Sequence, residues 1–108
     1  MHCRTTARRS SWLMAPGALA NVHARVMARS CERDAEAPPF FIEKILAGLP
    51  EDARLDYAVV PDAGHFAFFY PVPPLLATFP PGQDPPGFDR AAYQPQLYAE
   101  IVRFLRDR

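Results

Sequence analysis

Cysteine is scarce in this sequence, with two among 108 residues. Cys3 and Cys31 form neither a Cys-x-x-Cys pair nor a metal-ligand spacing. Because small secreted domains carry a denser disulfide framework, we expect two free thiols in a reducing compartment, and hence a cytoplasmic protein. His2 and His23 also lack partners at metal-ligand spacing. The sequence therefore predicts no metal site, and nothing in it points to another cofactor.

The sequence also lacks a long hydrophobic run. No apolar stretch approaches the roughly 20 residues that a membrane-spanning helix requires, so no membrane is expected as a partner. Acidic residues are missing from the first 30 positions, which hold five arginines. Arg8-Arg9 before a short apolar stretch is a weak sign of an export signal, and Pro16 and Gly17 interrupt that stretch. Export is therefore the weaker alternative to a cytoplasmic location.

An excess of charge of one sign is missing too. The formal net charge at pH 7 is zero, so no overall attraction to nucleic acid is expected. The aromatic run at residues 66–70 has no basic residue interleaved with it, unlike a stacking platform for single-stranded nucleic acid. The composition, 49% hydrophobic and 22% charged, is that of a globular domain. We expect one domain over residues 22–108, after a poorly defined lead-in over residues 1–21.

Proline, in contrast, is abundant, and 13 prolines divide the chain into short segments. Apolar residues three or four positions apart indicate helices, and a β-branched run closed by Pro61 indicates a strand. Pro95 suits the first turn of the last helix. The predicted elements are a strand at residues 22–30, a helix at 40–49, a strand at 55–60, a long loop at 71–90 and a helix at 95–106.

This order of elements predicts an α/β fold. A strand, a helix and a second strand form a parallel pair through a right-handed crossover. Parallel sheets have both faces covered by helices and are seldom built from two strands alone. The sequence therefore predicts an incomplete parallel sheet in a strand-helix-strand-loop-helix arrangement, to which further strands would be added.

Two titratable residues follow the two predicted strands. Asp34 comes after the first strand, and His65, preceded by Gly64, comes after the second. The carboxyl ends of parallel strands meet at one edge of a sheet, where catalytic groups collect. A carboxylate there accepts the imidazole N–H and fixes its tautomer, so that histidine can act as a general base. Phe66, Phe68 and Phe69 are expected to form aromatic walls beside it, with Phe66 and Phe68 lining a substrate pocket.

The residues leave other assignments open. Glu32 and Glu36 are rivals of Asp34 for the role of the acid. Asp34 could instead cap the helix that begins near Pro38. His65 could be a histidine that happens to lie in an aromatic loop, because a single histidine is weak evidence of catalysis.

Taken together, these motifs resemble the C-terminal part of α/β-hydrolases, especially the branch of esterases similar to dienelactone hydrolase. The resemblance rests on Asp34-x-x-Ala-Pro-Pro, on Gly64-His65-Phe66-x-Phe68 and on Gly-Phe-Asp-Arg-Ala-Ala at residues 87–92. It covers about residues 20–108. It implies a Ser-Asp-His triad that hydrolyses an ester or other acyl bond of a small molecule. Asp34 would be the acid and His65 the base.

The nucleophile of that triad is absent from this sequence. In the fold it stands in a Gly-x-Ser-x-Gly elbow upstream of the acid. None of the three serines, Ser10, Ser11 and Ser30, is flanked by glycine, and neither cysteine lies in an elbow. We therefore expect a fragment of a hydrolase that is inactive alone. The alternative is a small non-catalytic α/β binding module that associates, including with itself, through an open sheet edge.

Overall fold

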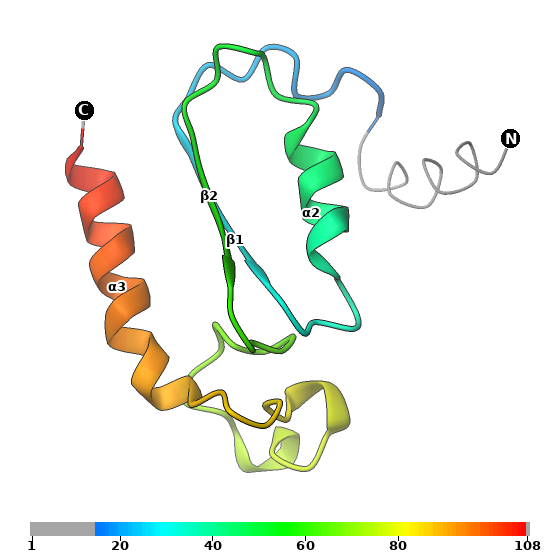
Figure 1. Ribbon diagram of the computed structural model, residues 1–108, viewed down its shortest axis with the longest axis vertical. Helices are drawn as coiled ribbons and strands as arrows, with labels where there is room; N and C mark the ends of the chain where they lie inside the picture. Colours follow the sequence, from blue (N-terminus) through cyan, green and yellow to red (C-terminus); the bar gives the residue numbers. More distant parts are fainter. Residues whose placement is uncertain (1–14, 108) are drawn as a thin grey trace, which may run out of the picture.

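The computed structural model describes residues 15–107 and is a mixed α/β structure (Figure 1). Two parallel strands lie between two helices, and a loop region with two short 3-10 helices joins the second strand to the last helix. The elements in order are β1 (Val26–Cys31), α2 (Pro39–Leu46), β2 (Leu55–Val60), η1 (Pro74–Leu76), η2 (Pro80–Gly82) and α3 (Arg90–Arg106).

The parallel strand pair predicted from the sequence is confirmed. β1 and β2 pair from Val26 opposite Leu55 to Cys31 opposite Val60. α2 covers one face of this sheet and α3 the other, as Figure 1 shows. Within residues 15–107 the sheet contains only these two strands, so each strand has one edge without a neighbouring strand in the described part of the chain.

Polar contacts connect each face of the sheet to its helix. On the α2 face, the hydroxyl of Tyr57 lies 2.9 Å from Ser30 Oγ and 2.8 Å from Glu43 Oε2. On the α3 face, the guanidinium of Arg29 donates to Glu100 at 3.3 Å and to Asp56 at 3.1 Å. Side chains alternate between the two faces along each strand, so Tyr57 reaches α2 and Arg29 reaches α3. The contacts hold each helix against its face of the sheet.

The apolar core is small. It lies where the ends of the strands meet the loop after β2 and the first half of α3. Its buried members are Cys31, Val60, Ala63, Ala67, Tyr93 and Leu97. α2 contributes no buried residue, and many large apolar side chains on β2, the loops and α3 are exposed. The helices therefore carry more apolar surface than the two strands can cover.

The first strand is shorter than the sequence predicted. β1 begins at Val26 rather than at residue 22, while the second strand spans Leu55–Val60 as expected. Before β1, backbone N–H groups of Ala18, Ala20 and Val22 close hydrogen-bonded turns. The last of these turns uses the N–H of Val22, the first residue of the predicted strand, for a bond to the Leu19 carbonyl. The rest of the predicted lead-in, including Arg8-Arg9, lies outside the described residues.

Both helices differ from the prediction at their ends. α2 ends at Leu46 rather than at Leu49, because the backbone there tightens into turns. α3 begins at Arg90, five residues before the predicted start at Pro95. The carboxylate of Asp89 accepts the N–H of Ala92 at 3.1 Å and so caps the helix. This cap outweighs Pro95, which lies inside the helix at the cost of one backbone hydrogen bond.

The loop after β2 is partly ordered into 3-10 turns. Our prediction of one long loop over residues 71–90 is therefore wrong in detail, since η1 and η2 lie within it. The prolines explain this, because each 3-10 helix begins with proline, whose fixed φ suits the first turn. Among residues 15–107, neither helix combines the length and the apolar character needed to cross a membrane.

Candidate functional site

Asp34 lies in a tight turn just beyond the carboxyl end of β1. Its Oδ1 accepts the backbone N–H groups of Glu36 at 2.9 Å and Ala37 at 2.8 Å. The residue is 8% exposed. These bonds hold the carboxylate before α2 begins, and Pro38, at the N-cap of α2, receives no side-chain cap. Asp34 therefore orders the turn that precedes the helix and does not cap the helix itself.

His65 follows β2 in a turn that packs closely against the loop region. Asp62 adopts a left-handed conformation with φ of 61° there, which aspartate tolerates better than most residues. A Cβ atom at Gly64 would lie 2.8 Å from Cδ of Pro85. Close approach to Pro85 thus explains this glycine, because it leaves no room for a side chain beside the histidine.

The two side chains meet at the carboxyl edge of the sheet. Nδ1 of His65 lies 3.0 Å from both Oδ1 and Oδ2 of Asp34. A carboxylate can only accept, so the imidazole donates its Nδ1–H, and in a neutral ring the lone pair is then on Nε2. Nε2 has no hydrogen-bond partner within residues 15–107, and the His65 side chain is 36% exposed. This arrangement can take a proton from a group that approaches Nε2.

Neither rival carboxylate reaches the histidine. Glu32 Oε1 accepts the backbone N–H of Asp62 at 3.1 Å, and Glu36 is exposed and donates its own N–H to Asp34. Among the described residues, Asp34 is the carboxylate hydrogen-bonded to His65.

The described candidates for a nucleophile are poorly suited to that role. Burial, together with the nearby Asp34 carboxylate, raises the pKa of the Cys31 thiol to about 11, so the reactive thiolate is scarce near neutral pH. Cys31 is also 3% exposed. Ser30 is buried, and its hydroxyl is bonded to Tyr57 on the α2 face. Ser10, Ser11 and Cys3 lie outside the described residues.

An apolar recess of about 270 Å³ opens beside the histidine. It is lined by His65, Phe66, Phe68, Phe69 and Leu76. Phe66, Phe68 and Phe69 are the aromatic wall residues named from the sequence, whereas Leu76 was missed. Phe69 lies one turn after Phe66, and its N–H donates to the Phe66 carbonyl at 2.9 Å. This spacing was visible in the sequence, but nothing there indicated that Leu76 folds back from η1.

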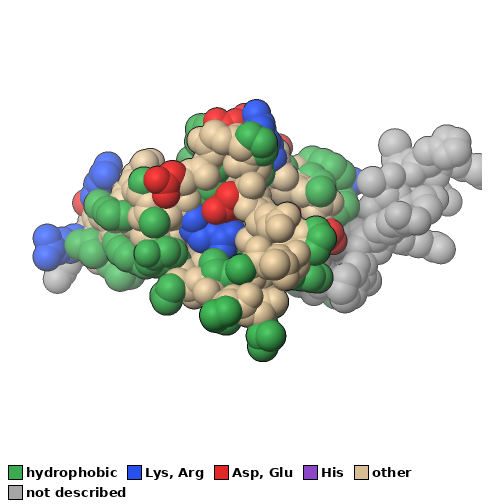
Figure 2. Space-filling view, turned by 90° about the horizontal axis from the view of Figure 1, so that it is seen from below, with side chains coloured by type: hydrophobic (Ala, Val, Ile, Leu, Met, Phe, Trp, Pro, Cys, Tyr) green, Lys and Arg blue, Asp and Glu red, His purple; other side chains and the backbone are tan. Residues whose placement is uncertain are grey.

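Arg90 holds the loop that carries Leu76. Its Nε and Nη2 donate to Asp84 Oδ1 at 3.0 and 2.8 Å. Nη2 also donates to the Gly82 carbonyl, and Nη1 donates to the Phe69 carbonyl. In Figure 2, basic and acidic atoms lie together in the middle of this end of the molecule. Arg90 and Asp84 help line a recess of about 720 Å³ there.

Comparisons with family models, curated proteins and solved structures gave no match for this chain. Among residues 15–107, no three histidine, cysteine or acidic side chains converge so as to hold a metal ion. The chemical meaning of the site therefore depends on its geometry, and the resemblance to α/β-hydrolases stays a prediction.

Proposed function

We propose that Asp34 and His65 are the acid and the base of a Ser-Asp-His triad that hydrolyses an ester or other acyl bond, as in α/β-hydrolases. The observation that carries this proposal is the bond from His65 Nδ1 to the buried carboxylate of Asp34, which leaves Nε2 free. In such triads the acid orients the imidazole and stabilises its protonated form.

The free Nε2 can serve both halves of an acyl transfer. It takes the proton of the nucleophile as the oxygen or sulfur of that nucleophile bonds to the acyl carbon. The imidazolium of His65, stabilised by Asp34, then gives this proton to the leaving oxygen as the bond to the acyl carbon breaks. Water repeats the two steps and releases the acid, which restores the nucleophile and the neutral imidazole.

The nucleophile, in this proposal, comes from a polypeptide segment outside these 108 residues, because none of them forms a Gly-x-Ser-x-Gly elbow. The low reactivity of Cys31 and the burial of Ser30 support this view. A chain without the nucleophile retains almost none of the rate that depends on the triad, because the triad acts as a unit. We therefore expect the chain alone to have no specific hydrolase activity.

The recess beside His65 supports a substrate with a compact apolar group. Its walls are aromatic and aliphatic, and no charged side chain lines it apart from the imidazole when protonated. For comparison, an apolar protein cavity of about 150 Å³ accepts benzene. The 270 Å³ recess is therefore large enough for a phenyl ring or a short branched chain next to the scissile bond.

The proposal is tested with a fluorophosphonate probe and intact-mass detection. The chain is examined alone and together with an α/β-hydrolase truncated before its acid-bearing strand, which carries the serine elbow. We expect no adduct on the chain alone and an adduct on the serine of the complement. His65→Ala should slow that labelling at least about 10³-fold.

Matched variants separate the role of the dyad from general damage to the fold. His23→Ala removes an exposed histidine and should leave labelling of the complement unchanged. Asp34→Ala should slow it, because the imidazole loses its fixed tautomer. An adduct on the chain alone that disappears in His65→Ala would place the nucleophile in this chain. Equal labelling with wild type and His65→Ala would refute the proposal.

A further inference from the structure

An exposed apolar stripe runs along α3. Four large side chains, Tyr98, Ile101, Val102 and Leu105, are between 37% and 68% exposed. We call them the outer stripe. Their spacing of three and four residues places them on one side of the helix. Exposed apolar side chains gathered in this way are typical of an interaction surface.

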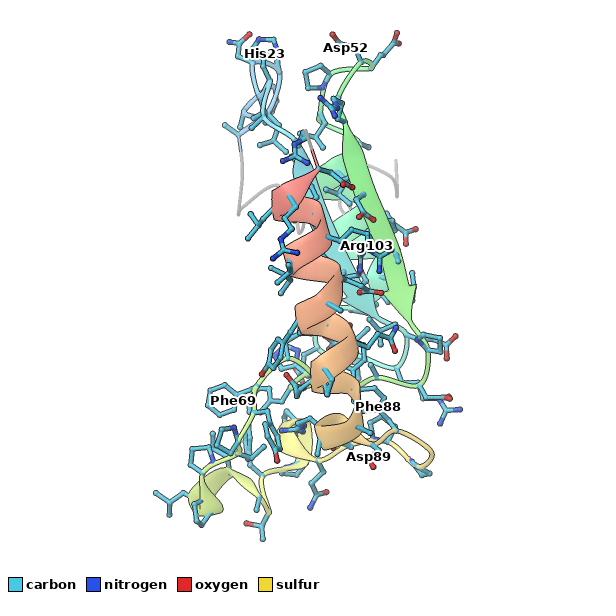
Figure 3. The ribbon with its side chains drawn as sticks, turned by 90° about the vertical axis from the view of Figure 1, so that its left-hand side faces the viewer. His23, Asp52, Phe69, Phe88, Asp89 and Arg103 are labelled. Atoms are coloured by element: carbon cyan, nitrogen blue, oxygen red, sulfur yellow. The ribbon has the colours of Figure 1, made fainter. Side chains whose placement is uncertain are left out.

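The outer stripe lies on the side of α3 away from β2. The opposite side of α3 is polar, where Glu100, Arg103 and Asp107 line a recess of about 350 Å³. This recess is also lined by Arg25 and Arg29 at β1 and by Arg54 and Asp56 at β2. Figure 3 shows Arg103 on this β2 side of the helix. At 100° per residue the outer stripe points to the other side. It therefore extends beyond the open edge of β1.

Within residues 15–107, the backbone of β1 is unpaired along the same edge. The N–H of Val26 donates to Arg54, and the N–H of Glu32 donates to Val60. Backbone groups of alternate residues point to the same side of a strand, so those of Met27 and Arg29 point away from β2. An unpaired strand edge is a template for pairing with another strand. The charged side chains over β2 disfavour such pairing at the other edge of the sheet.

Two contacts fix how α3 lies along β1. Arg29 Nε donates to Glu100 Oε2 at 3.3 Å, and Arg25 Nη1 donates to the Phe104 carbonyl at 2.7 Å. α3 is therefore antiparallel to β1, and the middle of the outer stripe lies level with the middle of the strand, near Ala28. A two-fold axis perpendicular to the sheet at this level would place the open edge of β1 against the same edge of a second copy. It would also place the outer stripe against the outer stripe of that copy.

We propose that a second copy of this chain pairs antiparallel along the open edge of β1. The two copies would form one continuous sheet of four strands, with both α3 helices on the same face. The axis would place Tyr98 opposite Leu105 of the second copy, and Ile101 opposite Val102. Met27 and Arg29 of the second copy would exchange backbone hydrogen bonds across the strand edge. The near-zero net charge of the chain adds no repulsion between the copies.

This pairing does not rest on the proposed hydrolysis. His65 lies at the end of the sheet and not along its β1 edge, so the dimer leaves its Nε2 free. A polypeptide that supplied a nucleophile by pairing with β1 would displace the second copy. The two proposals are linked through this competition for the β1 edge. The mass of the purified chain, however, tests only the pairing of two copies.

Sedimentation equilibrium of the purified chain tests the pairing directly. We expect twice the mass of the 12.1 kDa chain at 100 µM, with dissociation on dilution. A monomer at 100 µM would overturn the proposal. A continuous series of larger species would also overturn it, because a two-fold pairing closes after two copies.

Substitutions on α3 test the surface that is used. Leu105→Glu and Val102→Glu each place a charge against the apolar stripe of the second copy, and we expect each to weaken dimerisation at least roughly tenfold. Gln96→Glu adds the same charge on the polar side of the same helix, where Gln96 donates to Glu100, and should leave dimerisation unchanged. Far-UV circular dichroism checks that the helices persist. Equal dimerisation of all three variants would overturn the proposal.

Hydrogen exchange tests the strand pairing separately. The amides of Met27 and Arg29 lack partners among residues 15–107 of one copy, so they should exchange slowly in the wild-type dimer and rapidly in Leu105→Glu. The amide of Val26, which bonds to Arg54 in the same copy, should be protected in both. Rapid exchange of Met27 and Arg29 in the wild-type dimer would contradict antiparallel pairing along β1.

Discussion

Nδ1 of His65 lies 3.0 Å from each carboxylate oxygen of Asp34, and the same carboxylate accepts two backbone N–H groups from the turn that follows β1. The carboxylate is thus fixed by the backbone before it meets the imidazole. A side chain held in this way sets both the orientation and the tautomer of its partner.

The tautomer of His65 is the first testable consequence. We expect the neutral ring to carry its proton on Nδ1 in the wild type, because that nitrogen faces Asp34. Asp34→Ala removes the acceptor, so both tautomers should appear in ¹⁵N-edited NMR spectra of the imidazole. Glu32→Ala removes an exposed carboxylate that does not touch the ring and should change nothing. A wild-type spectrum with the proton on Nε2 would contradict the observed geometry.

Arg90 should contribute strongly to stability. Arg90 is 5% exposed, and its guanidinium bonds to Asp84 and to the carbonyls of Phe69 and Gly82. Arg90→Ala leaves these acceptors without their donor, and we expect the free energy of unfolding to fall by about 3 kcal/mol in urea titrations. Arg103→Ala removes an exposed arginine from the same helix and should cost less than about 0.5 kcal/mol. Similar losses for both variants would show that burial of Arg90 is unimportant.

The hydroxyl of Tyr93 should be dispensable for folding. It is buried and has no hydrogen-bond partner among the described residues. Removing a buried, unsatisfied polar group recovers its desolvation penalty, so Tyr93→Phe should raise the free energy of unfolding by about 1 kcal/mol. Tyr98→Phe removes an exposed hydroxyl from the same helix and serves as the control. A loss of stability in Tyr93→Phe alone would mean that the Tyr93 hydroxyl has a partner.

Stability should fall in alkali for a reason that lies in the core. Burial raises the pKa of Cys31 from an ordinary value of 9.0 to about 11, and burial also raises the pKa of Tyr93 to about 12. Above pH 9 the unfolded chain therefore releases these protons before the folded chain does, which favours unfolding. At pH 11 the loss from Cys31 is about 2 kcal/mol.

Urea titrations between pH 8 and pH 11 measure this loss. Cys31→Ala removes the thiol, so its stability should decline less steeply than that of the wild type over this range. Parallel declines for the wild type and Cys31→Ala would show that the thiol does not contribute. Near neutral pH both groups are neutral in both states and add no pH dependence.

The prediction of the fold succeeded where local signals agreed. It failed where two local signals competed and where tertiary contacts decided. β2 was predicted within its observed bounds because its β-branched end is closed by Pro61. The start of α3 was misplaced because the capping role of Asp89 was not recognised and Pro95 was given too much weight. The turns within residues 71–90 were not predicted, because they are held by contacts of Arg90 with the carbonyls of Phe69 and Gly82 that sequence patterns do not specify.

The sequence by itself determined which side chains stand at the ends of the strands: an aspartate after one strand, a histidine after the next, and aromatic residues beside the histidine. Only the tertiary structure decided among three carboxylates within five residues, because the backbone turn brings Asp34 alone to the imidazole. It also placed the outer stripe of α3 beyond β1. That direction depends on how the helix is rotated on the sheet, which the long-range contacts of Arg25 and Arg29 fix and which local sequence patterns do not specify.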